Sequence, residues 1–419
     1  MNKKELNEIK KNFTDFSGLL SIERVQTVYV NSQKEICCKA NKQYALIPEP
    51  EATVIMDSLR LVLKGTLGKN FNEYKFPAEA YEQYGAQKTL YAALHTKLDN
   101  DEDNDALISR IVNGIDYDLP YALLIAYCTY AIPTKDKNDE LDGNADDVFS
   151  FMVAAICPAE QTDFGFVYDS AKKALVKKDN TDLIINKKPT DGFMFPVFSD
   201  RAADVNSVAY YTSNANKPNV QFVEDVLGCK YTMSATGAKK AYQALIREVV
   251  GNEMSVAVAT QVNDAIKAHI AKHKNDTELP TIDAATIKHA LSDAGVSDEK
   301  LETLETCYKE KIGTELIASN IVENKLNVRA SDINISVGDT SQQCVRTTIR
   351  DGHWSLVVDL YDSAVQINGI DAKLYTNATD AVTIDGASEG LPATATAYTT
   401  DDNTEEDATC VVTDDTVEE

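Results

Sequence analysis

Two stretches of the chain are almost continuously apolar, residues 121–132 and residues 148–157. A strand with one face in water alternates apolar and polar positions, whereas a strand covered on both faces shows no alternation. We therefore predict that these two runs are the central strands of a sheet, although periodicity alone leaves a buried helix as an alternative. They are the candidate core of the protein.

A third stretch, residues 190–211, combines three features in one place. Aromatic residues gather at positions 193–198, charged residues follow at once, and a β-prone run from 205 to 211 closes the stretch. This order predicts a buried strand that carries charged side chains to the edge of a sheet.

The remaining pattern up to residue 216 predicts a mixture of helices and strands. Leu6, Ile9 and Phe13 recur at helical spacing and predict a short helix over residues 1–13. Turn residues at 31–33 between two β-prone runs predict a hairpin over residues 22–40. Further helices are predicted from Pro48 to residue 64 and over residues 78–98 and 103–115, and further strands over residues 164–168 and 183–186.

Beyond residue 216 the pattern changes twice. Five helices are predicted over residues 220–227, 236–250, 260–274, 283–294 and 298–311, with glycines after three of them. Short strands are then predicted over residues 333–337, 345–349, 354–358 and 364–367, and Asp351–Gly352 is a strong hairpin signal. The only tryptophan, Trp354, is interpreted as a core anchor of this small sheet.

These patterns together predict an α+β protein with three structured regions and a tail. We expect a mixed sheet-and-helix domain over residues 1–216, a helical segment over 217–316 and a small β-rich module over 317–372. Residues 373–419 are rich in Thr, Ala, Asp and Glu, and we expect this acidic tail to be largely disordered.

The charge of the chain narrows the classes of partner. The formal net charge is −25, and twelve Asp and Glu residues but no Lys or Arg follow Lys373, so the body is acidic even without the tail. Nucleic-acid binding needs clustered Lys and Arg to displace the counterions of phosphates. We therefore expect no nucleic-acid partner and no binding to anionic membranes.

Neither a membrane span nor a secretory segment is recognisable. No run reaches the roughly 18 apolar residues of a span, and the N-terminus is rich in Lys and Glu. The eight cysteines include no Cys-x-x-Cys pair and lie scattered through apolar runs, which predicts free thiols. We expect a soluble, cytoplasmic protein.

Three partial motifs fail on inspection. The Gly-Lys pair at 68–69 lacks the earlier glycine and the following Ser or Thr of a phosphate loop, and the acidic stretch 136–143 lacks the Glu that completes a calcium loop. His269 and His273 have helical metal-ligand spacing, but lysines crowd them and no Glu follows His269. We expect no cofactor and no metal.

The candidate functional cluster consists of Asp191, Asp200, Arg201 and Asp204. Three carboxylates and a guanidinium beside an apolar strand could hold a divalent cation and an anionic substrate group, which is the chemistry of a metal-dependent or small-molecule enzyme. Asp200 and Asp204 would share a face only in a helix. The alternative is that Arg201 pairs with one of these aspartates and fixes a loop at a strand end.

Several blocks of sequence resemble those of a bacterial family known only as a domain of unknown function. They are MNKKELNEIKKNF at residues 1–13, AAICP at 154–158, GFMFPVFSDR at 192–201, VLGC at 226–229 and NGI at 368–370. The resemblance implies no activity, cofactor or catalytic residue. No nucleophile elbow and no dinucleotide-binding glycine pattern accompanies it.

The leading hypothesis is therefore a non-catalytic binding or interaction protein, with the enzyme at the four-residue cluster as the alternative. The candidate surface is the β module, where the predicted hairpin over residues 345–358 has an outer edge with no obvious partner strand. A protein partner or a second copy of the chain would pair there. Arg346, Arg350 and Asp359 are alternatively charges that keep the edge from pairing.

The composition of the tail predicts that truncation after Asp371 leaves the folded part intact. The tail has too little apolar area to offset the conformational entropy lost on ordering it. Thermal unfolding of the truncated and full-length chains should give the same melting temperature. A fall of many degrees on truncation would show that the tail docks on the folded part.

Overall fold

A computed structural model of the chain shows the α+β class that the sequence predicts. It divides into two compact units, residues 1–336 and 337–419. The structure describes residues 1–14, 17–135, 141–161, 166–170, 172–177, 183–274, 276, 278–350, 352–359, 364–367 and 370–373. The acidic tail and the start of the calcium-loop-like stretch, residues 136–140, lie outside these ranges, and so do the predictions made for them.

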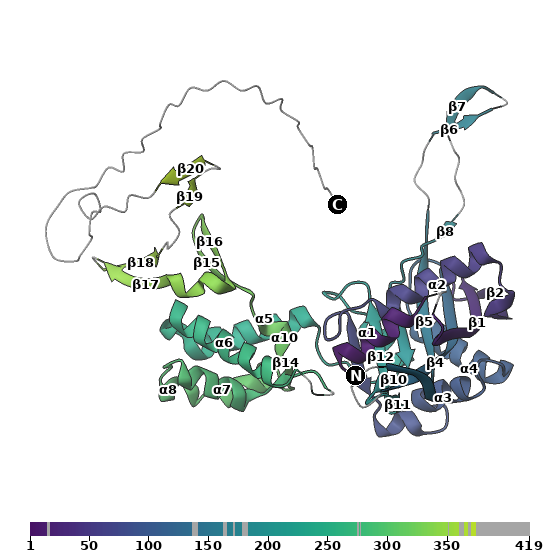
Figure 1. The fold of residues 1–419 in the computed structure, drawn as a ribbon, viewed down its shortest axis with the longest axis horizontal. Coiled ribbons are helices and arrows are strands. Elements are labelled where there is room, and N and C mark those ends of the chain that lie inside the picture. The colour runs from purple at the N-terminus through teal and green to yellow at the C-terminus, as the bar shows by residue number, and fades with distance from the viewer. Residues whose placement is uncertain are drawn as a thin grey trace. The chain divides into compact units, whose positions relative to one another are not determined.

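One antiparallel sheet dominates the first unit (Figure 1). Its strands run in the order β2-β1-β4-β5-β9-β12-β3, and β8 pairs with β5 beside this path. The strands are β1 (Leu20–Val30), β2 (Ile36–Gln43), β3 (Phe71–Lys75), β4 (Tyr121–Lys135), β5 (Leu141–Gln161), β8 (Leu183–Ile185), β9 (Asp191–Phe195) and β12 (Ser207–Thr212).

The two long apolar runs form the neighbouring central strands β4 and β5, so the strand prediction is confirmed and the buried-helix alternative is wrong. Their register pairs Tyr121 with Pro158 and Ala131 with Val148. Every side chain from Phe151 to Cys157 is fully buried. The absence of alternation in the sequence therefore reflects cover on both faces.

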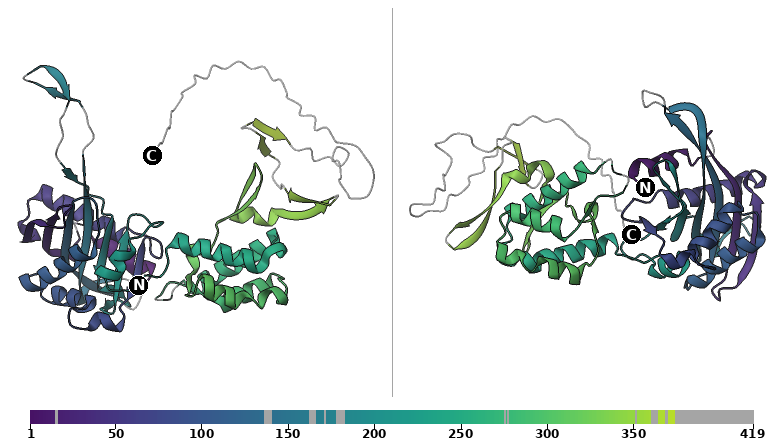
Figure 2. Two further views of the ribbon diagram at one scale, coloured as in Figure 1. Left: turned by 180° about the vertical axis from the view of Figure 1, so that it is seen from behind. Right: turned by 90° about the horizontal axis from the view of Figure 1, so that it is seen from below.

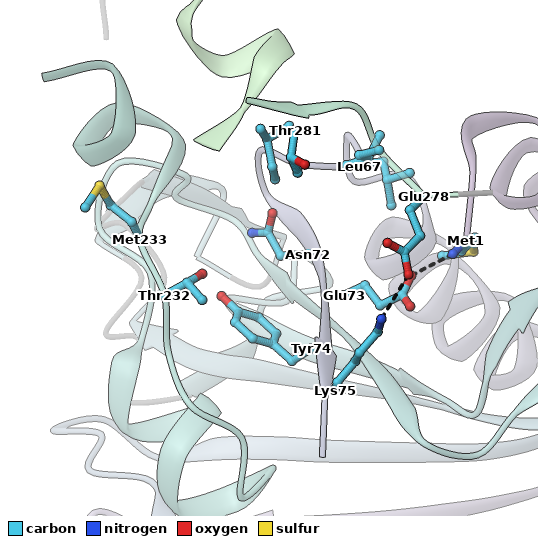
Figure 3. A pocket seen from close by; sticks show the side chains of 13 residues that line it. Met1, Leu67, Asn72, Glu73, Tyr74, Lys75, Thr232, Met233, Glu278 and Thr281 are labelled. Atoms are coloured by element: carbon cyan, nitrogen blue, oxygen red, sulfur yellow. Dashed lines mark hydrogen bonds and ion pairs between the residues drawn. The ribbon is translucent and has the colours of Figure 1, made fainter. Parts of the chain in front are cut away.

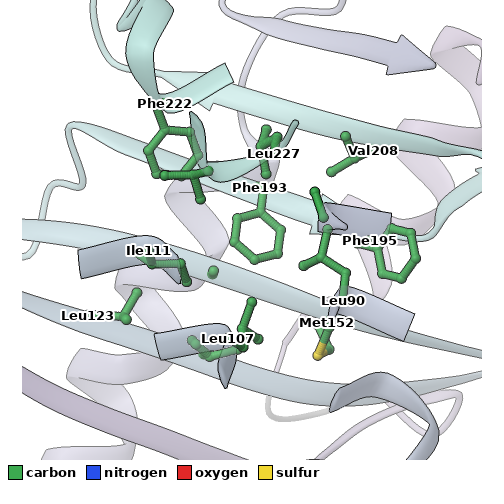
Figure 4. Close-up of a cluster of buried hydrophobic side chains, with 14 of the residues drawn as sticks. Leu90, Leu107, Ile111, Leu123, Met152, Phe193, Phe195, Val208, Phe222 and Leu227 are labelled. Atoms are coloured by element: carbon green, nitrogen blue, oxygen red, sulfur yellow. The ribbon is translucent and has the colours of Figure 1, made fainter. Parts of the chain in front are cut away.

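Helices provide that cover in two layers. Met152, Ala154 and Ile156 of β5 belong to a core shared with α3 (Ala86–His95), α4 (Asp101–Gly114) and the π-helix η3 (Phe222–Val226), as Figure 4 shows. The alternate residues Val153, Ala155 and Cys157 belong to a second core shared with α1 (Lys3–Asn12) and α2 (Glu49–Leu63). The first unit thus contains a sheet between two helical layers.

Three predicted helices differ from the structure. The helix predicted over residues 298–311 is two short helices, α8 (Asp298–Leu301) and α9 (Leu304–Lys311). The helix predicted over residues 78–98 is a 3₁₀ turn, η2 (Ala78–Tyr81), followed by α3, because the chain turns sharply at Gly85. A Cβ atom at Gly85 would lie 2.3 Å from the carbonyl oxygen of Ala80. The predicted helix over residues 220–227 is the short η3, which packs into the core of the sheet.

The helical segment forms its own core and is drawn in green in Figures 1 and 2. Ser234, Ser255 and Asp283 cap helix N-termini by accepting hydrogen bonds from backbone N–H groups, as such residues commonly do. The elements are α5 (Ala235–Val250), α6 (Val256–Lys272), β13 (Thr281–Ile282), α7 (Ala284–Asp293), α8 (Asp298–Leu301), α9 (Leu304–Lys311), β14 (Leu316–Ile317) and α10 (Ala318–Ile321). No helix of the described residues is long and apolar enough to cross a bilayer.

The C-terminal strands pair as separate two-stranded ribbons and do not merge into the single small sheet that was expected. They are β15 (Lys325–Ala330) with β16 (Ile333–Gly338), β17 (Val345–Arg350) with β18 (His353–Val358), and β19 (Ala364–Ile367) with β20 (Ile370–Lys373). The 3₁₀ turn η5 (Asp339–Cys344) precedes β17. The side chain of Trp354 lies outside the described part, so its role as a core anchor stays a prediction.

The packing at Gly192 generates a test of the central sheet. A Cβ atom there would lie 2.4 Å from the carbonyl oxygen of Ala154 and 2.7 Å from the side chain of Val62. Gly192→Ala should therefore lower stability by about 1–3 kcal/mol, as overpacked cores do. Thermal unfolding measures the effect.

Gly18→Ala is the matched control, because an added Cβ atom meets nothing within 4 Å there. It should leave the melting temperature unchanged or raise it slightly. Equal melting temperatures for the two variants would contradict the close approach of β9 to β5.

Candidate functional site

The structure does not bring the four predicted site residues together. Asp191 is the first residue of β9, whereas Asp200, Arg201 and Asp204 lie beyond its far end. A five-residue strand spans roughly 13 Å, so the length of β9 separates Asp191 from the other three. A single metal or substrate group could not touch all four.

Asp200 and Arg201 form the tight turn of a hairpin between β10 (Val197–Ser199) and β11 (Ala202–Asp204). Their φ angles are 50° and 58°, which are left-handed values and not helical ones. Because the segment is not helical, Asp200 and Asp204 do not share a helical face. Such a turn matches the twist of the strands that it joins, but Arg is an uncommon residue in this conformation.

Arg201 pairs with Glu8 of α1. Its Nη1 lies 3.0 Å from both carboxylate oxygens of Glu8, and its Nη2 donates to the carbonyl oxygen of Pro133 at 2.8 Å. Tyr130 donates a further hydrogen bond to Glu8 at 2.8 Å. The alternative that Arg201 fixes a loop fits these contacts, and they add a partner that the sequence did not predict, because Glu8 is 193 positions away.

Asp200 contributes through its backbone. Its N–H donates to Oε1 of Glu5 at 2.7 Å, and Glu5 also closes the capping box of α1 with Asn2. The hairpin is therefore held to the first turns of α1 at two neighbouring points, through Glu5 and Glu8. This arrangement positions the hairpin. Asp200 and Asp204 also line an open pocket of about 580 Å³ with Glu73, Asp276 and Glu278, although no group of three such side chains among the described residues is placed to hold a metal ion.

Asp191 lies in a buried hydrogen-bond network of its own. Tyr117 donates to one carboxylate oxygen, and Tyr210 donates to the other at 2.5 Å. Tyr210 in turn accepts from the backbone N–H of Asn219 at 3.0 Å. Only 4% of the Asp191 surface is exposed, so its carboxylate is shielded from solvent.

Burial is the main influence on the ionisation of this network. It raises the pKa of Asp191, and the hydrogen bonds from Tyr117 and Tyr210 partly oppose the shift. Burial and the nearby Asp191 carboxylate raise the pKa values of both tyrosines. Both carboxylate oxygens have donors, so Asp191 cross-links β9, β12 and the chain before β4 and leaves no open position for a substrate.

Tyr117 and Thr190 are the members of this network that line a shallow pocket of about 220 Å³. Their hydroxyl oxygens lie 3.1 Å apart, so each has a partner already. Sequence reasoning missed Tyr117 because 74 positions separate it from Asp191. The acidic residue alone was visible in the sequence, and its two donors were not.

A pocket of about 270 Å³ lies along the edge strand β3 (Figure 3). The terminal ammonium of Met1 pairs with Glu73 at 2.7 Å, and Lys75 pairs with Glu278 at 2.9 Å. Tyr74, also in the lining, is hydrogen-bonded to Thr232. The charges of this pocket therefore neutralise each other, and it offers little to a charged ligand.

Among the described residues, no group of three His, Cys, Asp or Glu side chains is placed to hold a metal ion. The imidazoles of His269 and His273 lie 4.6 Å apart but have other partners. His269 Nε2 lies 2.9 Å from the carbonyl oxygen of Thr281, and His273 Nδ1 lies 2.6 Å from the carboxylate of Asp276. Their spacing is that of helix neighbours with separate contacts.

The β17–β18 hairpin is the second candidate site. Val345 pairs with Val358 and Arg350 with His353, across the turn that the sequence predicts. Within the described part of the chain, neither strand has a further strand beside it. Alternation places Val345, Thr347 and Ile349 on one face, across from Val358 and Leu356 of the neighbouring strand.

This face is apolar but partly open. Ile349 is 62% exposed and Val358 is 40% exposed, whereas Val345 is buried. Arg346 and Arg350 occupy the other face, and Arg346 lies 3.3 Å from Asp359. The hairpin is thus amphipathic, with two unpaired strand edges and an uncovered apolar end.

Comparisons with known proteins give a single match. The model of a family described as Domain of unknown function (DUF4317) matches residues 1–370. This range contains every block on which the sequence resemblance rested, so that resemblance is confirmed. No curated protein and no solved structure matches the chain.

The Asp191 network predicts a specific pH dependence. Burial raises the pKa of the Asp191 carboxyl in the folded state. The carboxyl therefore contributes most to the free energy of unfolding below the unfolded-state pKa of about 3.9, where it is protonated. That contribution to stability is lost as pH rises through the folded-state pKa. Asp191→Asn removes the ionisable group and keeps its shape. The wild type should therefore lose stability relative to the Asn variant as pH rises above about 4.

Melting temperatures of both proteins across this range give the measurement. Asp191→Ala is the complementary variant, because it leaves the buried hydroxyl of Tyr210 without its carboxylate acceptor, at a cost of about 1–3 kcal/mol, whereas Tyr117 keeps its contact with Thr190. Parallel pH profiles for the wild type and the Asn variant would show that the carboxylate carries no burial penalty. An Ala variant as stable as the wild type would contradict the cross-linking role.

Proposed function

The chain belongs to the family described as Domain of unknown function (DUF4317), and from that premise we propose that it is a non-catalytic binding protein. It acts through the β17–β18 hairpin, whose free strand edge pairs with a strand of a protein partner. We also propose that the protein is bacterial and cytoplasmic. The described cysteines are free thiols, as is usual in a reducing compartment.

The observation that carries the proposal is the isolation of the hairpin. A two-stranded hairpin alone is marginally stable in water, and a third strand or a covering surface is needed for independent stability. No third strand pairs with this hairpin among the described residues, and although Val345 is buried, Ile349 remains 62% exposed. A partner strand would supply both the missing hydrogen bonds and the missing cover.

The register identifies the backbone groups that a partner would meet. A two-residue turn is closed by a hydrogen-bonded pair, here Arg350 with His353, and hydrogen-bonded pairs alternate with non-bonded pairs along the ladder. The amides of Arg346, Thr348 and Arg350 therefore face β18. Those of Thr347 and Ile349 face outward and are free to donate to an added strand.

A different protein is favoured over a second copy of the chain. Each copy has a formal net charge of −25, so two copies repel each other before their hairpins meet. Arg346 and Arg350 instead attract a partner with acidic residues beside its strand. The same overall charge disfavours nucleic acid and anionic membranes.

Three observations weigh against the enzyme alternative at Asp191, Asp200, Arg201 and Asp204. The length of β9 separates Asp191 from the others, both oxygens of Asp191 accept hydrogen bonds from tyrosines, and Arg201 is engaged by Glu8. The contacts of Asp191 and Arg201 stabilise the fold, and this explains their positions. A catalytic role would require most of these contacts to break.

Site-specific photo-cross-linking in cells tests the proposal with the full chain. A photoreactive residue at position 349 should give one discrete adduct with a partner protein. The same residue at His289, whose side chain is also highly exposed on α7, should give none. Thr347→Pro removes an outward amide and should abolish the adduct, whereas Thr347→Ala should retain it.

Two outcomes would contradict the proposal. Adducts that persist in the Thr347→Pro variant would show that strand pairing is not involved. An adduct of twice the chain mass would identify a second copy as the partner and overturn the preference for a different protein.

A further inference from the structure

A large pocket of about 730 Å³ lies in the helical segment, and its lining includes no residue of the hairpin or of the four-residue cluster. It runs between α5 and α6, and residues 321–329 form one side. This volume falls within the range of about 300–1,000 Å³ that is usual for small-molecule sites. Neither the proposed function nor the family description assigns a role to it.

The floor of the pocket is apolar. Ile246, Val258, Val262, Ile266, Leu291 and Ile321 line it, and each is less than a tenth exposed. These side chains come from four different helices, so the floor is part of the core of the helical segment. An unbranched hydrocarbon chain could lie along it and remove further apolar surface from water.

The wall made by residues 321–329 is fixed to both helices. Asn263 of α6 donates to the carbonyl oxygen of Glu323 and accepts from its backbone N–H, each at 2.8 Å. Lys239 of α5 pairs with the Glu323 carboxylate at 2.7 Å. The pocket is therefore held open before a ligand arrives, which reduces the entropy lost on binding.

Four polar groups in the lining have no partner among the residues that the structure describes: the hydroxyl of Tyr242, the amide of Gln243 and the guanidinium groups of Arg247 and Arg329. Glu323 is the one acid among the described lining residues, and Lys239 already neutralises it. The pocket thus combines an apolar floor with two uncompensated positive charges, in a chain of net charge −25. The pocket at β3 differs because its charges pair with each other.

We propose that this pocket binds an amphipathic carboxylate, with the hydrocarbon chain on the apolar floor and the carboxylate between Arg247 and Arg329. A guanidinium matches the planar geometry of a carboxylate, and the Tyr242 hydroxyl supplies a neutral donor. Burial also raises the pKa of Tyr242, which keeps that hydroxyl protonated as a donor. This site is independent of the hairpin and of its partner.

Calorimetric titration of the full chain with decanoate tests the proposal. Decanoate should bind at least tenfold more tightly than decyltrimethylammonium, which has the same chain and the opposite charge. Affinity should rise roughly fourfold with each methylene from octanoate to decanoate, as expected for burial of the added groups. Tyr242→Phe should weaken binding severalfold.

The double variant Arg247→Gln/Arg329→Gln should lose tenfold or more in affinity for decanoate. Both arginines are exposed, so the variant should keep the melting temperature of the wild type. Arg350→Gln, which removes an exposed arginine of the hairpin, is the matched control and should change nothing. Val262→Trp fills the floor and should abolish binding.

The proposal is overturned if decanoate does not bind at millimolar concentration, or if the two head groups bind equally. Unchanged affinity in the double glutamine variant would overturn it as well, and that result does not depend on whether the Val262→Trp variant folds. The hairpin cross-link should be the same with and without decanoate, so failure here leaves the proposed function standing.

Discussion

Cover on both faces of strands β4 and β5 is the constraint on which the first unit depends. Because both faces are apolar, a helical layer must pack on each, and the α1–α2 and α3–α4 layers do so. Gly192 is part of the same constraint, since β9 approaches the carbonyl oxygen of Ala154 too closely for a side chain. Charged groups lie at the strand ends. Asp191 and Arg201 each need a specific partner there, because burial of an unpaired charge costs free energy.

The sequence predicted what depends on local pattern. Unbroken apolar runs identified β4 and β5, helical spacing identified α1, and Asp351–Gly352 identified the turn of the β17–β18 hairpin. It could not predict the partners of Asp191 and Arg201, because Tyr117 and Glu8 come from distant positions that only the fold brings near. The sequence did not predict the break before α3. That break depends on the close approach of Gly85 to Ala80, which the hydrophobic periodicity does not indicate.

The same limit applies to the candidate sites. A cluster of acidic residues in sequence suggested a metal or substrate site, but each member proved to be engaged elsewhere or separated by the length of a strand. The α5–α6 pocket was invisible in the sequence, since Arg247 and Arg329 are 82 positions apart and belong to different elements. Polar groups with internal partners stabilise a fold. Polar groups that lack partners and lie beside apolar surface can contribute most to the free energy of ligand binding. By that criterion the hairpin and the α5–α6 pocket are the surfaces for which we propose a function.

Amide hydrogen exchange, read at single residues in the dilute full chain, tests most directly whether the hairpin edge is free for a partner. If the edge is free, we expect nearly unprotected exchange at the outward amides of Thr347 and Ile349. Exchange should be slower at the inward amide of Thr348 and slowest in β5. Addition of the cross-linked partner protein should slow exchange at Thr347 and Ile349. Protection of these two amides in the isolated chain, to the level of β5, would show that the edge is already paired and would contradict the account.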